Sequence, residues 1–142
     1  MAKSLASPLF FPNFARTFSG ISELVICNTV SARAKLRDEG ATVASGTGFF
    51  GSKMTKMGTN ARELELLVKY SGFSPMGAIV TVILNGAKAC ALETNVGSIE
   101  EGKSADLIIV DGNPLTDVYI LQQSERIRTV IKEGRMEVNQ DI

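Results

Sequence analysis

The sequence predicts an α/β fold, and three observations support that class. A helical segment over 21–39 is followed by a glycine, a short strand over 41–45 and a glycine-rich loop, which is the order of elements in a parallel sheet. Two further segments with helical apolar spacing, over 60–71 and 74–91, predict helices. Nearer the carboxyl end, an apolar run and an alternating pattern predict a second, smaller sheet.

The first twenty residues differ in composition from the rest of the chain. Residues 1–20 are rich in Ser and Phe, and their charges are Lys3 and Arg16. Pro8 and Pro12 interrupt what would be the apolar region of a secretory signal. The acid-poor composition is compatible with an organellar transit peptide. We predict an irregular segment here in preference to a targeting signal.

The predicted helix over 21–39 carries start and stop signals. Ser22 can cap its first turn, and Glu23 suits the positive end of the helix dipole. An apolar stripe recurs at helical spacing through Leu24, Cys27, Val30 and Ala34. Gly40 stands where a helix commonly ends in a left-handed residue.

The strand over 41–45 leads into a loop with glycines at positions 46, 48, 51 and 58. In barrels of parallel strands the loops after the strands' carboxyl ends carry the chemistry. The spacing of a phosphate-binding loop, GxxxxGK[ST], is not met, so nucleotide binding is not expected. We expect Lys53 and Lys56 to be solvated.

The two following helices differ in character. Asn60 and Glu63 have the spacing of a capping box, and Gly72 ends that helix. Ser74 and Pro75 open the next helix in the favoured order of cap and then proline. Apolar residues occupy most of the circumference of this helix, which predicts that it is deeply buried.

The second sheet follows. Residues 107–110 are all Leu, Ile or Val and are bounded by turn residues, which predicts a strand buried on both faces with Asp106 at its start. Residues 127–132 and 135–138 alternate and flank a two-residue turn at Glu133 and Gly134, which predicts a hairpin. Together they make a sheet of at least three strands.

Composition argues against several function classes. Net charge is zero, with +4 over residues 1–72 and −4 over 73–142, and no basic cluster is interleaved with aromatics, so no nucleic-acid partner is expected. No run of 18 apolar residues indicates a membrane span. Cys27 and Cys90 lie in apolar surroundings and are predicted to be buried free thiols. We expect a cytoplasmic protein, or an organellar one if residues 1–20 are a transit peptide.

Three stretches carry a resemblance. GSIEEGKSADLIIVDGNPL resembles a segment near the carboxyl end of metal-dependent amidohydrolases of the imidazolonepropionase and prolidase type. IRTVIKEGRMEVN is similar to the closing hairpin of that family. GTNARELELLVKYSGFSPMGAIVTVILNGAKACAL resembles the helices that precede the first segment. The resemblance covers residues 41–139.

The resemblance implies an incomplete fold. Family members have a (β/α)8 barrel, which needs about 250 residues, whereas this chain has 142. After the irregular segment over 1–20, it implies a partial barrel over 21–92 with the last helix, last strand and terminal helices. Residues 93–142 would form part of the accessory β-sandwich. The expected partners are further copies of this chain or the missing half of the barrel.

The resemblance also implies a chemistry that this chain lacks. Amidohydrolases hydrolyse amide and related bonds with divalent metals, such as zinc, held by histidines, a lysine or glutamate, and an aspartate after the last strand. This chain has no histidine, and Gly48 occupies the position of that aspartate. We therefore expect no cofactor, metal ligand or catalytic residue in this chain. Thr47, Lys53 and Asn60 are candidates for the pocket rim.

Two hypotheses about function follow. The first is the C-terminal part of a metal-dependent hydrolase of carbon–nitrogen bonds, inactive by itself, and GTNARELELL resembles members that act on dipeptides or acyl amino acids. The second is a non-catalytic structural or oligomerisation module derived from that fold. A third, less favoured hypothesis is an active enzyme that uses Asp106 or Glu63 with Lys53.

Overall fold

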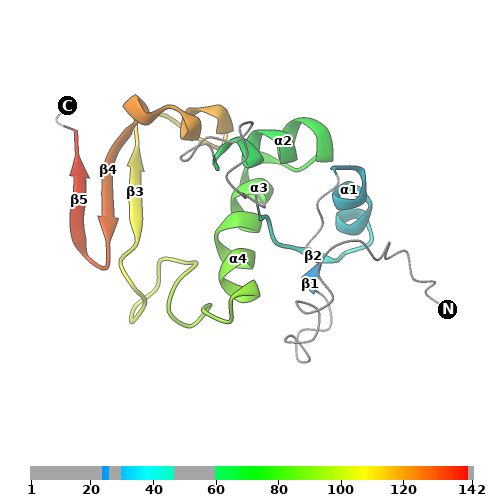
Figure 1. Ribbon diagram of the computed structural model, residues 1–142, viewed down its shortest axis with the longest axis horizontal. Helices are drawn as coiled ribbons and strands as arrows, with labels where there is room; N and C mark the ends of the chain where they lie inside the picture. Colours follow the sequence, from blue (N-terminus) through cyan, green and yellow to red (C-terminus); the bar gives the residue numbers. More distant parts are fainter. Residues whose placement is uncertain (1–23, 26–29, 47–59, 141–142) are drawn as a thin grey trace, which may run out of the picture.

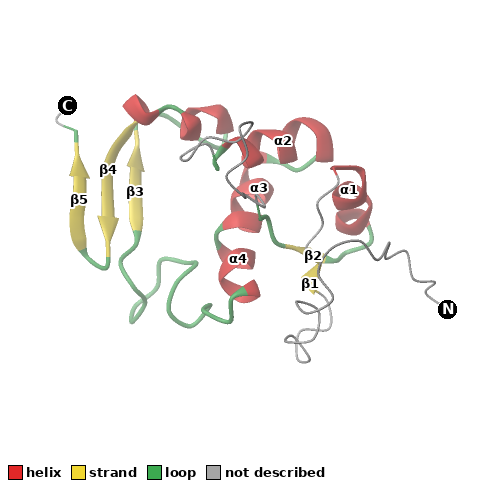
Figure 2. Cartoon of the chain, viewed as in Figure 1, coloured by secondary structure: helices red, strands yellow, loops and turns green. Residues whose placement is uncertain are grey.

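The computed structural model describes residues 24–25, 30–46 and 60–140. The three-stranded sheet lies at one end of the long axis, and the two-stranded pair and the first helix lie on the other side of the remaining helices (Figures 1 and 2). The segment over 1–20 and the loop residues Thr47, Gly48 and Lys53 lie outside the described residues.

A parallel strand pair confirms the α/β class. Strand β1 (Leu24–Val25) pairs in parallel with β2 (Thr42–Val43), and helix α1 (Val30–Asp38) connects them. The prediction of one helix over 21–39 is wrong, because the apolar run Leu24–Val25–Ile26 contains β-branched residues and its start forms a strand. Gly40 has φ +81° after α1, as its position predicts.

Helix α2 (Arg62–Ser71) confirms the helix predicted over 60–71, except for the way in which it begins. The cap residue is Ala61, with no side-chain cap, so the predicted capping box of Asn60 and Glu63 does not form. The Glu63 carboxylate instead forms an ion pair with Arg33 of α1. Gly72 ends the helix with φ +66° and donates its N–H to the carbonyl of Leu67.

The predicted helix over 74–91 is two short helices, α3 (Pro75–Val82) and α4 (Leu84–Ala89). Ser74 caps α3 as predicted, with its Oγ accepting from the Gly77 N–H at 3.1 Å. The prediction of deep burial is wrong, since Met76 and Ile83 are 52% and 51% exposed. Their apolar side chains have no covering element among the described residues.

The second sheet has three antiparallel strands, which confirms the predicted sheet of at least three, and their order is β3–β4–β5. These are β3 (Leu107–Val110), β4 (Ile127–Lys132) and β5 (Arg135–Asn139). Glu133 and Gly134 form the two-residue turn with φ +51° and +76°. The prediction that 107–110 is buried on both faces is wrong, because Ile108 and Ile109 are 55% and 54% exposed.

One small core joins the helices to the segment that follows β3. Leu64 and Leu67 of α2 pack with Ala78 of α3 and with Val118. Val118 belongs to the 3-10 helix η1 (Val118–Gln122), which a second one, η2 (Ser124–Arg126), follows before β4. The Gln122 amide donates to the Glu65 carboxylate at 2.9 Å across the same junction. The helices therefore contact the sheet end of the chain through η1.

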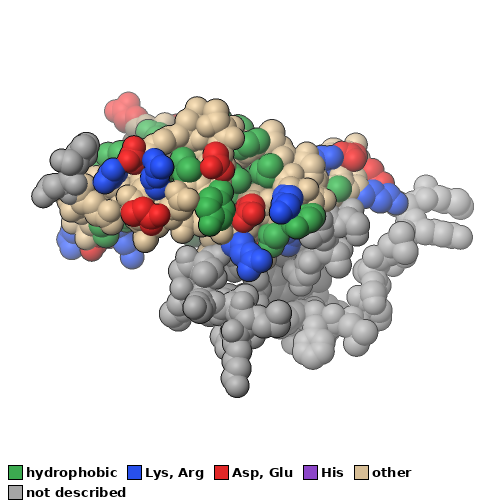
Figure 3. Space-filling model, turned by 90° about the horizontal axis from the view of Figure 1, so that it is seen from above, with side chains coloured by type: hydrophobic (Ala, Val, Ile, Leu, Met, Phe, Trp, Pro, Cys, Tyr) green, Lys and Arg blue, Asp and Glu red, His purple; other side chains and the backbone are tan. Residues whose placement is uncertain are grey.

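The described surface mixes both signs of charge. On the face that Figure 3 shows, acidic and basic side chains are interspersed between apolar ones. Within the described residues, no helix has the length and apolar character that crossing a bilayer requires. Location in the cytoplasm stays a prediction.

Candidate functional site

The end of β2 is the place where a parallel α/β arrangement would carry chemistry. Val43 and Ala44 are buried there, and the backbone N–H of Ser45 donates to the carbonyl of Thr81 in α3 at 3.1 Å. The Asn85 amide of α4 donates to the Val43 carbonyl at 2.8 Å. Two helices thus hold the strand end where residues 47–59 begin.

Three polar groups of these elements are enclosed by the protein. The side chains of Arg33 and Glu63 are 7% and 13% exposed and form an ion pair that joins α1 to the first turn of α2. The Ser45 Oγ is buried and has no hydrogen-bond partner among the described residues. The ion pair positions the start of α2, and Asn60 stands exposed just before it.

The predicted site residues divide into two groups. Thr47, Gly48 and Lys53 lie outside the described residues, and no finding tests their role. Asn60 is described, and it is exposed immediately before α2. The third hypothesis, an enzyme using Glu63 or Asp106, finds no support in the described contacts. Glu63 pairs with Arg33, and Asp106 accepts a hydrogen bond from the Glu133 N–H at 2.7 Å.

The described residues of this chain do not offer a ligand set for a divalent metal. Imidazole ligands are impossible because the sequence contains no histidine. The described residues contain no group of three Cys, Asp or Glu side chains that could hold an ion. Glu63 is the described carboxylate that follows β2 most closely in sequence. It forms an ion pair with the guanidinium of Arg33. We therefore derive no catalytic step through a metal in this chain.

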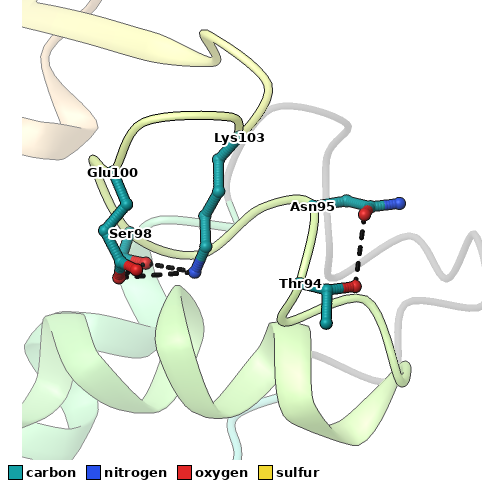
Figure 4. A network of polar contacts seen from close by, with 5 residues as sticks. All are labelled: Thr94, Asn95, Ser98, Glu100 and Lys103. Atoms are coloured by element: carbon teal, nitrogen blue, oxygen red, sulfur yellow. Dashed lines mark hydrogen bonds and ion pairs between the residues drawn. The ribbon is translucent and has the colours of Figure 1, made fainter.

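A second polar arrangement, which the sequence analysis missed, lies in the turn before β3. Ser98 donates to the Glu100 carboxylate at 2.5 Å, and the Lys103 ammonium contacts Ser98 Oγ at 2.6 Å and Glu100 at 3.4 Å (Figure 4). The hydrogen bond from Ser98 and then the Lys103 charge lower the pKa of Glu100. The positions of Ser98, Glu100 and Lys103 follow no helical or strand period, so sequence periodicity could not reveal their contact.

This turn borders a cavity of about 800 Å³ between the helices and the second sheet. Its walls include Ile83 and Ala87 on one side and Leu107, Ile108 and Val130 on the other. Lys103 lines it with a side chain 13% exposed. Cys90 also lines it and is an exposed free thiol, so the prediction of a buried Cys90 is wrong. Cys27 lies outside the described residues.

Known proteins resemble most of this chain. Ochratoxinase of Aspergillus niger is 29% identical over 99 residues, which cover 69% of this chain and 21% of that protein. Imidazolonepropionase of Thermoplasma volcanium is 30% identical over 73 residues, covering 51% of this chain and 18% of that protein. A solved Xaa-Pro dipeptidase with methionine bound in its active site superposes with a TM-score of 0.68 and 34% identity. That superposition covers 78% of this chain and 25% of the dipeptidase.

The chain therefore spans about a fifth to a quarter of the length of the ochratoxinase and the dipeptidase that it matches. The model of the Amidohydrolase family matches residues 20–136, which is most of the sequence. That range contains the glycine-rich sequence after β2, the helices α1 to α4, and β3 and β4 of the second sheet. The chain belongs to the Amidohydrolase family.

Proposed function

We propose that this chain provides the C-terminal part of a hydrolase acting on carbon–nitrogen bonds and that it does not catalyse hydrolysis by itself. Membership of the Amidohydrolase family supports the class. The absence of suitable metal ligands supports the second part of the proposal, that the chain does not catalyse hydrolysis by itself. The sequence has no histidine, and the Glu63 carboxylate that follows β2 pairs with Arg33.

The proposed fold is a fragment of a (β/α)8 barrel with part of a β-sandwich. The parallel unit β1–α1–β2 and helices α2 to α4 supply the end of the barrel, over residues 21–92. The three-stranded sheet within residues 93–142 supplies half of the sandwich. Exposed apolar side chains on α3 and β3 support this interpretation, since they match faces that a complete fold would cover.

The substrate class is proposed from the relatives alone. A Xaa-Pro dipeptidase and an ochratoxinase are among the matches, which supports a substrate with an amide bond to an amino acid. In the complete protein a divalent metal such as zinc would be held by residues outside this chain. We propose Thr47, Lys53 and Asn60 as rim residues and Gly48 as the replacement for the metal-binding aspartate.

The first test uses the chain alone. We expect no hydrolysis of N-acyl amino acids or dipeptides and no zinc retained after gel filtration, because the chain lacks imidazole donors. The measurements are product release and metal analysis of the same sample. Zinc at one ion per chain, or turnover that a chelator abolishes, would contradict the proposal.

The second test asks whether Gly48 is the missing ligand position. A hybrid enzyme would carry residues 41–139 in place of the matching C-terminal segment of Aspergillus niger ochratoxinase, which keeps its own histidines. We expect the hybrid to be inactive and Gly48→Asp to raise its rate at least about a hundredfold, the contribution of a positioned acid–base group. Gly46→Asp is the matched control, because Gly46 has open space around its Cβ position. Equal activity with glycine at position 48 would overturn the assignment.

A non-catalytic assembly module is the second candidate function. The exposed apolar strand β3 favours it, because Ile108 and Ile109 are each more than half exposed in a strand that carries no charge. In this function the chain would use the same surfaces to bind another copy or a separate barrel half. A defined oligomer without metal or activity would support it.

A further inference from the structure

Asn85 and Gly86 are neighbours of a kind that is prone to a spontaneous chemical change. The backbone nitrogen of the residue after an asparagine can attack the side-chain amide carbon, and a glycine offers no side chain to hinder that approach. This chemistry contributes to the thermal lability of asparagine in proteins. No other asparagine in the sequence precedes a glycine. The sequence thus singles out Asn85 as the asparagine to consider for deamidation.

The fold itself gives no reason for a glycine at position 86. Gly86 is not among the glycines with positive φ. A Cβ added there would meet the Thr81 carbonyl oxygen at 3.9 Å, which is an ordinary contact. A glycine inside a helix also lowers helix stability relative to alanine. Gly86→Ala therefore removes the reactive pair without disturbing what surrounds it.

The backbone nitrogen of Gly86 lies where a helix leaves N–H groups without a bond. Ile83 ends α3 and also precedes the first residue of α4 as its cap. The Ala87 N–H donates to the Ile83 carbonyl at 2.9 Å, which closes the first turn of α4. Gly86 comes before Ala87, and N–H groups of a first turn have no acceptor within their helix. The interruption at Ile83 therefore leaves the attacking nitrogen without the protection that a continuous helix gives.

Strand β2 engages the other half of the reactive pair. The Asn85 amide nitrogen donates to the Val43 carbonyl at 2.8 Å, and Val43 is 3% exposed. That nitrogen is the leaving group, so this hydrogen bond must break before the reaction can proceed. We propose that Asn85 and Gly86 form a deamidation site whose rate is controlled by the contact between α4 and β2. The reaction then releases that contact irreversibly.

The reaction uses water as its co-reactant. The Gly86 nitrogen gives its proton to the solvent and bonds to the side-chain carbon of Asn85, and the amide nitrogen takes up a proton and leaves as ammonia. Water then opens the cyclic imide at either of its two carbonyl carbons. One product is aspartate, and the other is isoaspartate, in which the backbone runs through the side-chain carbon. No oxidant or reductant takes part, and the loss of ammonia to solvent makes the change one-way.

Neither product can keep the contact with β2. A carboxylate has no proton to donate, and it would place a negative charge beside a carbonyl oxygen that is shielded from water. Isoaspartate also lengthens the backbone by one atom within α4, a helix of six residues. The end of β2 then depends on the remaining contact from the Ser45 N–H to the Thr81 carbonyl at 3.1 Å. The modification therefore loosens the strand end that leads into residues 47–59.

The first test follows the reaction in the whole chain. Folded protein and the same protein unfolded in urea are incubated at mildly alkaline pH, and peptide mapping by mass spectrometry locates the converted asparagine. We expect conversion at Asn85, at least about tenfold slower in the folded protein, because an open state populated a tenth of the time or less limits it. Gly86→Ala should slow the conversion in urea. Equal rates in the two states, or no conversion of Asn85 in urea, would overturn the proposal.

The second test changes the contact with matched substitutions. Val43→Ala loosens buried β2, whereas Val138→Ala makes the same change in β5, where Val138 is 40% exposed. We expect Val43→Ala to speed the conversion of Asn85 in the folded protein about tenfold, because it raises the population of the open state. Val138→Ala should leave the rate unchanged, and circular dichroism checks that both variants fold. An equal rate in the two variants would contradict control by β2, and the comparison of folded and unfolded wild type needs neither variant.

The consequence of the reaction is measured with Asn85→Asp, which has the structure of one product. We expect a lower urea midpoint than in the wild type, and an unchanged midpoint in Asn95→Asp, the control at an exposed asparagine. Equal midpoints for the wild type and Asn85→Asp would show that the contact is not released. These experiments read a covalent change and stability, so their results leave the hydrolase proposal unaffected.

Discussion

The side-chain amide of Asn85 donates a hydrogen bond of 2.8 Å to the backbone carbonyl of Val43, which joins helix α4 to strand β2. Val43 is 3% exposed, so its carbonyl has little access to water. An asparagine lowers helix propensity, and this contact gives a physical reason for one inside α4. It also explains why the strand end is held although β1 and β2 have two residues each.

We expect Asn85→Ala to lower the free energy of unfolding by about 1–3 kcal/mol, because it leaves a buried carbonyl without its donor. Urea denaturation followed by circular dichroism measures the change. Asn95→Ala is the control, since Asn95 is exposed and its side-chain contact is with Thr94. A loss as large in the control as in Asn85→Ala would contradict this role.

The Arg33–Glu63 ion pair predicts a second difference in stability. Both side chains are largely buried, so Glu63→Leu should cost about 3 kcal/mol by leaving the guanidinium without its carboxylate. The double variant Arg33→Leu with Glu63→Leu should lose less than the sum of the single variants. The exposed pair of Lys35 and Glu39 is the comparison, and Glu39→Ala should cost about 0.5 kcal/mol or less. Additive losses in the double variant would argue against coupling.

Gly97 is the third position with a defined expectation. It has φ +97°, and a Cβ there would lie 2.7 Å from the Ala87 Cβ. Gly134 also has positive φ, +76°, but its Cβ position meets nothing within 4 Å. Gly134→Ala should therefore cost about 1–2 kcal/mol from backbone conformation alone. Gly97→Ala should cost more, because α4 must also move. Equal losses of unfolding free energy for the two variants in denaturant titrations would show that α4 accommodates the added methyl group without cost.

Glu100 supplies a prediction about pH. Its pKa is lowered first by the Ser98 hydroxyl and then by Lys103, so the folded chain favours the ionised carboxylate. That contribution to stability is present above the pKa of the unfolded chain and is lost as pH falls through the lower, folded pKa. NMR titration of Glu100 should show the low pKa, and Ser98→Ala should move it back towards the ordinary value. An unchanged pKa in Ser98→Ala would assign the effect to Lys103.

Local signals predicted several boundaries correctly. Gly40 and Gly72 end helices in the left-handed region, Ser74 caps α3, and the turn at Glu133 and Gly134 joins β4 to β5. Each of these depends on neighbours in sequence, through a positive φ or a single side chain that reaches a nearby N–H. Such features need no distant partner, so the sequence contains the information.

Predictions that depended on distant contacts failed. The stripe over 21–39 fits a helix, yet Leu24–Val25 pairs with Thr42–Val43, because a parallel neighbour can satisfy a strand's backbone. Glu63 has capping-box spacing, yet Arg33 on another helix takes its carboxylate. Apolar runs at Ile83 and Ile108 predicted burial, but burial requires a covering element as well as an apolar side chain.

The candidate site shows the same division. The absence of histidine and the glycine at position 48 are properties of the sequence, and they determine that imidazole cannot hold a metal here. Only the tertiary structure decided that Glu63 is paired and that Ser98, Glu100 and Lys103 meet beside a cavity. Among the described residues, it also decided that β3 pairs on one side with β4. Residue chemistry is set one position at a time, whereas pairing and exposure depend on which distant surfaces come together.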